Sequence, residues 1–274
     1  MIDLSSLRIG CISWTYPDWL SSFYPEGTKS SEFLSLYSRV FDLVEIDSTF
    51  YRTPYAATVK HWKEKTPANF LFSAKLPKKI THDSRLKDVS NNVKGFETVI
   101  KGLGTKLACV IAQMPPNFKF ENGFELLCGF LEEVDPTIKY AIEFRNSSWF
   151  REETYNLLKK KHVSLAWSVS QSTRGKATLE VTTDFLYLRF MGQFGDFRKF
   201  DHVQKEKTPI LEEWLQNLKN APGSVSQVYV LMSNHFEGFA PSTANSFRKL
   251  LGLEELNWKE RMSRSKKKRD CLDV

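Results

Sequence analysis

The sequence predicts a single α/β domain folded as a (β/α)8 barrel, and two observations carry that prediction. Apolar, β-branched runs of the kind found in buried parallel strands occur eight times in the 274-residue chain. Apolar stripes at helical spacing separate most of these runs. No change of composition marks a second domain, and no segment repeats. We therefore expect residues 1–256 to form the barrel and residues 257–274 to form a basic, disordered tail.

The expected elements alternate along the chain. The strands are residues 8–13, 43–47, 69–75, 107–113, 139–145, 163–168, 185–191 and 227–233. The helical stripes lie at 33–41, 54–62, 89–103, 124–134, 155–158, 211–218 and 247–251. Thr53-Pro54 and Thr208-Pro209 each predict a helix start, because threonine caps a helix and proline suits its first turn.

The sixth unit departs from this alternation. Gln171 to Gly175, which follow the sixth strand, carry no apolar stripe, so we expect an irregular segment there instead of a helix. An open, doubly wound sheet is the alternative fold. Such a sheet usually has a glycine-rich first turn, and residues 11–15 have no such pattern.

In a barrel of this kind the functional groups lie at the carboxyl ends of the strands. The second strand ends with Glu45 and Asp47 on one face, and Thr49, Phe50 and Tyr51 follow as candidate substrate-binding residues. Two carboxylates beside an apolar wall repel each other and lose hydration, and both effects raise a carboxyl pKa toward the range useful in acid–base catalysis. The alternative is a structural ion pair with a basic residue of the barrel.

The first and third strands bring further candidates to the same end. Trp14 and Tyr16 follow the first strand and either wall a pocket or fill the barrel rim as packing. Lys75 ends the third strand and can hold an anion or act as base or nucleophile. His82, on the loop that follows, either contacts substrate or hydrogen-bonds to the backbone.

The remaining strand ends complete the candidate site. Gln113 ends the fourth strand, Glu143 and Arg145 end the fifth, and Asn234 follows the eighth. Glu143 can converge with the carboxylates of the second strand, and Arg145 offers a planar fork for a carboxylate or phosphate. An inward arginine is costly unless it is paired, so Arg189 on the seventh strand should meet a buried carboxylate or a bound anion.

Several classes of site have no signature in the sequence. The five histidines are scattered, without H-E-x-x-H or H-x-H, so we expect no dedicated transition-metal site, and the pattern leaves open a carboxylate-held Mg²⁺. The nucleophile elbow and the glycine-rich phosphate loop are both absent, and no cofactor is indicated.

Charge and cysteine usage bear on partners and compartment. The formal net charge is +7, and part of the excess lies between Arg261 and Arg269, a run that can bind nucleic acid. The four cysteines form no C-x-x-C pair, which favours a reducing cytoplasm. No apolar run approaches the roughly 18 residues of a membrane span, and the first residues do not resemble a signal peptide. The sequence does not indicate an oligomeric state.

One set of strand-end motifs, taken together, is specific. It comprises residues 10–19, 23–25, 44–51, 72–75, 113–116 and 143–145, with Trp62, Thr66-Pro67, Thr81-His82, Trp149, Tyr187, Arg189, Gly192 and Asn234. With these motifs the chain resembles the YecE-like family, a family of unknown function, from Ile9 to about Leu253. The resemblance implies a TIM barrel and implies no reaction. Ser168 and Met191 stand where the family tends to have aspartate and histidine, so the resemblance also implies altered or lost activity if those two residues are acids or ligands.

Three functional hypotheses follow. The first is an enzyme, of hydrolase or isomerase/lyase type, acting on a small anionic, sugar-like or phosphorylated substrate, with Glu45, Glu143 and Lys75 as catalytic groups. A glycosidase with two carboxylates is a narrower version of this hypothesis. The second is a nucleic-acid-binding or nucleic-acid-processing barrel that uses the basic tail. The third is a barrel that binds a ligand without catalysis.

Overall fold

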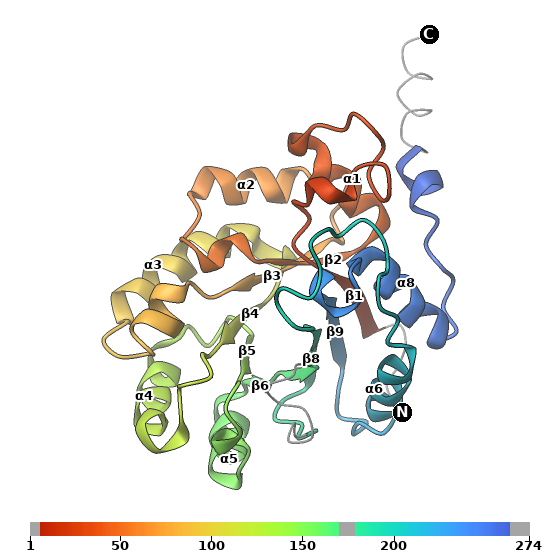
Figure 1. Cartoon of the computed structure of the whole chain (residues 1–274). Helices are drawn as coiled ribbons and strands as arrows, with labels where there is room; N and C mark the ends of the chain where they lie inside the picture. The colour runs from red at the N-terminus through yellow and green to blue at the C-terminus, as the bar shows by residue number, and fades with distance from the viewer. Residues whose placement is uncertain (1–5, 170–178, 264–274) are drawn as a thin grey trace.

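The parallel strands form one sheet that curls into a nearly closed barrel (Figure 1). The computed structural model describes residues 6–169 and 179–263. Neighbouring strands follow the order β6-β5-β4-β3-β2-β1-β9-β8-β7, and β6 and β7 at the two ends of this order are consecutive in the chain. The predicted α/β, TIM-like barrel is therefore confirmed.

All eight expected strands are present, and one of them is divided. The strands are β1 (Leu7–Ile12), β2 (Leu43–Ile46), β3 (Leu71–Lys75), β4 (Leu107–Gln113), β5 (Tyr140–Glu143), β6 (Ser164–Leu165), β7 (Trp167–Val169), β8 (Phe185–Phe190) and β9 (Gln227–Met232). The division of the expected sixth strand falls at Ala166, whose amide donates to the carbonyl of Ile142 at 2.8 Å. β6 pairs with β5, and β7 pairs with β8.

The irregular sixth unit is visible only in part. The segment expected to be irregular, Gln171 to Gly175, lies outside the described residues. Residues 179–184, which lead into β8, contain no helix.

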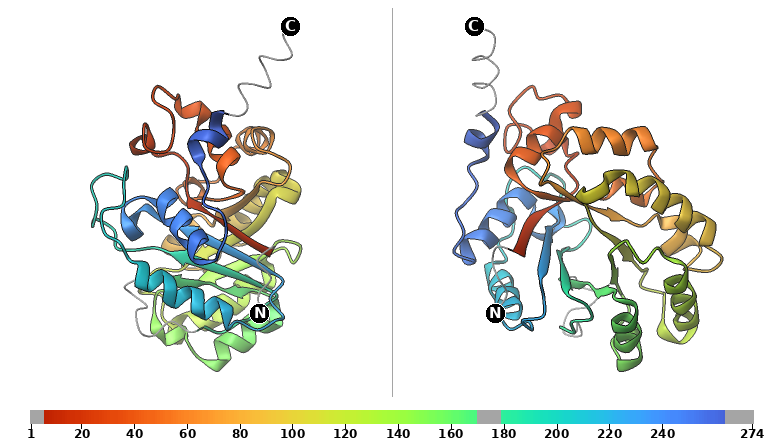
Figure 2. Two further views of the ribbon diagram at one scale, coloured as in Figure 1. Left: turned by 90° about the vertical axis from the view of Figure 1, so that its right-hand side faces the viewer. Right: turned by 180° about the vertical axis from the view of Figure 1, so that it is seen from behind.

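The helices lie outside the strands and cover the barrel (Figures 1 and 2). They are α1 (Phe33–Val40), α2 (Ala56–Glu64), α3 (Ser90–Ile100), α4 (Phe120–Glu133), α5 (Glu152–Lys161), α6 (Thr208–Lys219), the short α7 (Asn234–Glu237) and α8 (Ala240–Leu250). In α1, α3 and α6 the buried residues include most of those of the predicted apolar stripes.

Two predicted helix starts are displaced. α2 begins at Ala56 with extended Tyr55 as its N-cap, so Thr53 does not cap it. α6 begins at Thr208 with Lys207 as its N-cap, which puts proline in the first turn. The local pattern located both helices to within a few residues but did not specify the cap.

The last described residues extend the packed part of the chain. The Trp258 ring lies 5.7 Å from that of Phe23, and its indole N–H donates to the Ser22 carbonyl at 3.1 Å. Met262 is buried, and its carbonyl accepts from Arg39 at 3.0 Å. Residues after the expected boundary at 256 therefore pack on the loop after β1 and on α1, and the boundary itself stays a prediction. The rest of the expected tail lies outside the described residues.

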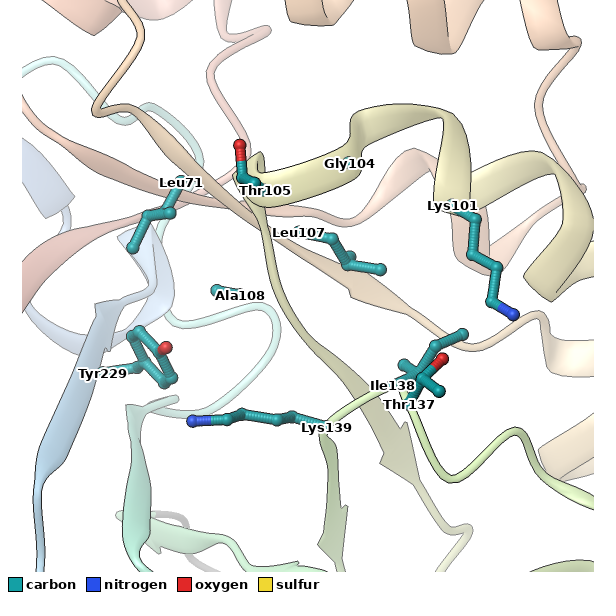
Figure 3. A pocket seen from close by; sticks show the side chains of 10 residues that line it. All are labelled: Leu71, Lys101, Gly104, Thr105, Leu107, Ala108, Thr137, Ile138, Lys139 and Tyr229. Atoms are coloured by element: carbon teal, nitrogen blue, oxygen red, sulfur yellow. The ribbon is translucent and has the colours of Figure 1, made fainter.

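The amino ends of the strands frame a pocket of about 540 Å³ (Figure 3). Leu71, Leu107 and Tyr229 line it, and the Lys139 side chain extends across it toward Tyr229. None of the predicted site residues lines this pocket, because they lie at the opposite end of the strands. No helix in the described ranges is long and apolar enough to cross a bilayer.

Candidate functional site

A buried arginine lies between two carboxylates inside the barrel. Arg189 of β8 is fully buried, and its Nε and Nη2 donate to the two carboxylate oxygens of Glu45 at 3.0 and 2.7 Å. Its Nη1 donates to Glu143 Oε2. The prediction that Arg189 meets a buried carboxylate is confirmed, and the expected convergence of Glu45 and Glu143 takes place on this one guanidinium.

Neighbouring side chains complete the hydrogen bonding of both carboxylates. The Tyr187 hydroxyl donates to Glu45 Oε2 at 2.9 Å and shares a 2.5 Å hydrogen bond with Ser73. The Gln113 amide donates to both oxygens of Glu143 at 3.1 and 3.2 Å. We call these six residues (Glu45, Ser73, Gln113, Glu143, Tyr187 and Arg189) the inner layer. Every carboxylate oxygen in the inner layer accepts at least one hydrogen bond.

The charges of the inner layer stabilise one another. Burial alone would raise the pKa of Glu143, but the guanidinium of Arg189, and then that of Arg145, hold this pKa below its usual value. Burial by itself would lower the pKa of Arg189, but the carboxylates of Glu45 and then Glu143 raise this pKa above its ordinary value. The lowered pKa keeps the Glu143 carboxylate ionised, because the arginines outweigh burial.

A second set of groups lies one step nearer the strand ends. Lys75 Nζ donates to Asp47 Oδ1 at 3.0 Å and lies 4.1 Å from the centre of the Phe50 ring. The Asp47 side chain is 32% exposed and the Lys75 side chain 9%. Glu45 and Asp47 therefore do not form the mutually repelling pair that the sequence suggested, because each carboxylate has its own cation.

His82 and Arg145 border this pair. The His82 ring packs edge-to-face on Phe50 at 5.0 Å, and its Nδ1 hydrogen-bonds with the Thr81 hydroxyl at 2.9 Å. Burial, with Lys75 and then Arg145, lowers the pKa of His82 to about 4, so its ring is neutral at pH 7. Arg145 Nε donates to Glu143 Oε1 at 3.5 Å, and its side chain is 29% exposed. We call Asp47, Lys75, His82 and Arg145 the outer layer.

The loop after β1 contributes Tyr16, and the short helix α7 directly after β9 contributes His235. Burial, and then Asp47, raise the pKa of Tyr16, whose hydroxyl stays protonated beside the outer layer. Its ring packs on Phe200 at 5.8 Å, and Phe200 packs on His235 at 5.0 Å. The sequence argument did not select His235, although its place directly after the last strand pointed to it.

A glycine brings the β8 and β9 loops together. Gly192 has φ +67°, and a Cβ there would lie 1.8 Å from the His235 carbonyl oxygen. A side chain at this position would push the two loops apart, so only glycine fits.

Three predicted substrate-binding residues are buried and make structural contacts. Trp14 is buried and packs edge-to-face on Trp62 at 5.8 Å, between the barrel and α2. Thr49 is buried and donates to the carbonyls of Ile46 and Lys75 at 2.8 and 2.6 Å. Asn234 Oδ1 is 2.8 Å from the Ala240 amide that donates to it, and it also accepts from Trp19. A strand-end position does not fix the direction of a side chain, and a binding role for these three residues stays a prediction.

Predictions about metals and nucleic acid have no direct counterpart in the structure. In the ranges 6–169 and 179–263, no group of three or more His, Cys, Asp or Glu side chains is placed to hold a metal ion. A carboxylate-held Mg²⁺ stays a prediction. Most of the basic run that suggested nucleic-acid binding lies beyond residue 263, outside the described residues.

Comparison with protein families gives a match over most of the chain. The family model "Protein of unknown function DUF72" matches residues 8–268. The chain belongs to the DUF72 family. Among DUF72 relatives, UPF0759 protein YunF of Bacillus subtilis is 26% identical over 272 residues, covering 90% of this chain and 95% of YunF. UPF0759 protein YecE of Escherichia coli K12 is 29% identical over 154 residues, 55% of this chain and 54% of YecE. The predicted YecE-like resemblance is confirmed.

Solved structures of the DUF72 family share the fold. A Thermotoga maritima member superposes with a TM-score of 0.77 at 29% identity, covering 90% of this chain and 99% of its own. An Enterococcus faecalis member gives 0.73 at 20% identity, with 90% and 96% covered. D-psicose 3-epimerase, with 11% identity, a TM-score of 0.50 and 82% and 84% covered, shares the barrel fold alone.

Proposed function

We propose that this DUF72 protein is an enzyme that binds a small anionic, sugar-like or phosphorylated substrate at the outer layer and acts on it by proton transfer. One observation carries the proposal. Asp47, Lys75, His82 and Arg145 come from β2, β3 and β5 or the loops after them, with β4 between β3 and β5. They converge above a buried network whose carboxylates are already hydrogen-bonded. Converging charged groups at this end of a barrel are typical of active sites.

Lys75 and Arg145 supply the anion site in this proposal. An ammonium has three N–H donors and a guanidinium five, while Lys75 donates to Asp47 and Arg145 donates from Nε to Glu143. Their remaining donors suit a phosphate or carboxylate, and a planar guanidinium binds either through two hydrogen bonds.

Asp47, His82 and Tyr16 are the proposed proton-transfer groups. Asp47 is partly exposed and beside both Lys75 and Tyr16, so a substrate proton can reach it. His82 is neutral at pH 7, and a bound anion would raise its pKa from about 4 toward the working range. In this assignment Glu45 and Glu143, first expected to be the acid and base, hold Arg189 and so position the layer above.

The binding half of the proposal is tested with Lys75→Met and Arg145→Gln. Inorganic phosphate and a panel of sugar phosphates are the probes, and the rise in melting temperature is the measurement. Lys78→Met is the matched control, since Lys78 is exposed on the next loop and pairs only weakly with Asp83, at 3.9 Å. We expect about tenfold weaker binding or more in the two site variants, as a lost charged hydrogen bond predicts. Unchanged binding in both would refute the anion site.

The catalytic half needs its own measurement. Exchange of substrate C–H hydrogens for deuterium in D2O, followed by NMR, reports proton abstraction directly. We expect exchange in the wild type and its loss in Asp47→Asn. A stabilising ligand that never exchanges or turns over would support the non-catalytic barrel in place of the enzyme.

A further inference from the structure

Large exposed aromatic side chains gather at the same end of the barrel as the outer layer. Tyr51 is 74% exposed, Tyr55 72% and Phe194 88%. In the described part of the chain only one other large apolar side chain, Leu179, is comparably exposed. Tyr51 and Tyr55 follow β2 and Phe194 follows β8, so all three lie on loops after the strand ends. Exposed aromatics gathered at one place mark an interaction surface.

Ring contacts extend these residues into two groups, one after β2 and one after β8. Tyr51 packs on Phe50 at 5.6 Å, and Phe50 in turn borders the outer layer. On the other side, Phe194 packs on His235 at 5.1 Å, and His235 packs on Phe200. We call Phe50, Tyr51, Tyr55, Phe194 and Phe200 the aromatic rim. The loops that carry it follow β2 and β8, and only β1 and β9 lie between these strands in the sheet.

Positive charge surrounds the aromatic rim. The Arg52 guanidinium lies 5.8 Å from the centre of the Tyr55 ring. On the loops after β2, β3 and β8, the exposed cations are Arg52, Lys78, Lys79, Arg85, Lys87, Arg198, Lys199 and Lys205, and the carboxylates, exposed or half-buried, are Asp47, Asp83, Asp88, Asp196, Asp201 and Glu206. Cations therefore outnumber carboxylates on the loops that carry or touch the rim. A neutral planar ligand would gain nothing from this excess, whereas a polyanion with planar groups would use both features.

We propose that the aromatic rim binds single-stranded nucleic acid. Bases stack on Tyr51, Tyr55 and Phe194, and phosphates lie against the flanking lysines and arginines. None of these residues belongs to the basic run between Arg261 and Arg269, and the proposal does not depend on any chemistry at Lys75 or Asp47.

The experiment compares two strands that carry the same phosphates. A fluorescent oligothymidine of about twenty nucleotides and an abasic strand of equal length are titrated with the full chain, and anisotropy is read at several salt concentrations. We expect the wild type to bind the strand with bases more tightly. Tyr51→Ala/Tyr55→Ala should lose about tenfold or more in affinity for that strand, since stacking contributes roughly 1–3 kcal/mol per base. Tyr51→Phe/Tyr55→Phe keeps the rings and should bind like the wild type.

A variant of the full chain distinguishes binding at the aromatic rim from binding at the basic tail. Lys266→Ala/Lys267→Ala/Lys268→Ala should flatten the salt dependence and keep the preference for bases. Phe194→Ser tests the second side of the rim independently. Three outcomes would each overturn the proposal. The wild type could bind the abasic strand as tightly as the strand with bases, or the alanine and serine variants could bind like the wild type. The tail variant could also lose binding completely. Displacement of the oligonucleotide by a neutral oligosaccharide would also overturn it, in favour of a carbohydrate surface.

Discussion

The inner and outer layers are built from the same strands yet behave differently. Moving two residues along one face leads from Glu45 to Asp47 on the second strand, and from Ser73 to Lys75 on the third. Glu45 and Ser73 are fully buried and hydrogen-bonded. Asp47 is partly exposed to solvent, and Lys75 pairs with Asp47. One step along a strand thus separates groups that hold the barrel together from groups available to a ligand.

The largest expected effect is on the inner layer. Arg189→Met leaves Glu45 and Glu143 buried without their shared cation, and we expect it to lower the free energy of unfolding by about 3–5 kcal/mol. Lys75→Met removes the same charge from the outer layer, where Asp47 can turn to water, and should cost about 1 kcal/mol or less. Urea denaturation of both variants gives the two values. Equal losses of unfolding free energy in the two variants would contradict the distinction between the inner and outer layers.

A smaller effect is expected for acid stability. The folded-state pKa of Glu143 lies below its ordinary value of 4.5, so this carboxylate contributes stability above that pH. The contribution is lost as the pH falls through the lowered pKa. Glu143→Gln should therefore be less stable than the wild type at pH 7, by about 1–3 kcal/mol, and the gap should narrow under acid. Urea midpoints from pH 7 down to pH 3 test this, and a gap that widened on acidification would contradict it.

The smallest expected effect is a shift in one titration. NMR of the His82 ring should give a pKa of about 4, and Lys75→Met should raise it, because the ammonium of Lys75 disfavours a second positive charge. Lys78→Met should raise it less, since Lys78 contributes least among the charges that act on His82. An equal shift in the two variants would show that distance within the outer layer does not matter.

The sequence predicted the barrel and the main elements of the inner layer well. Long apolar runs at regular intervals identify buried parallel strands, and a single inward arginine demands a carboxylate. It could not decide which carboxylate pairs with which cation, because Glu45, Asp47 and Glu143 are all near the strand ends. The pairing depends on the register between neighbouring strands, because the register decides which side chains lie at the same height in the barrel. The register is a property of the folded sheet and cannot be read from the sequence.

The direction of a side chain was equally hard to predict. The sequence left Trp14 either as a pocket wall or as packing, and in the structure it follows Ser13, which has φ 65°, with its ring against α2. Left-handed backbone at a serine is uncommon and has no reliable sequence signal. Met191, expected as a histidine in the family pattern, lies two residues beyond Arg189 and places no titratable group at that strand end.

The Arg189 ion pairs also bear on how the barrel unfolds. Glu143, Glu45 and Arg189 belong to β5, β2 and β8, which occupy the second, fifth and eighth places in the order of nine strands. The three residues therefore reach into the lumen from three evenly spaced strands of the barrel. A chain that ended before β8 would lack Arg189, which leaves Glu45 without its buried cation and Glu143 with Arg145 alone. Opening any third of the barrel separates Arg189 from at least one of its two carboxylates.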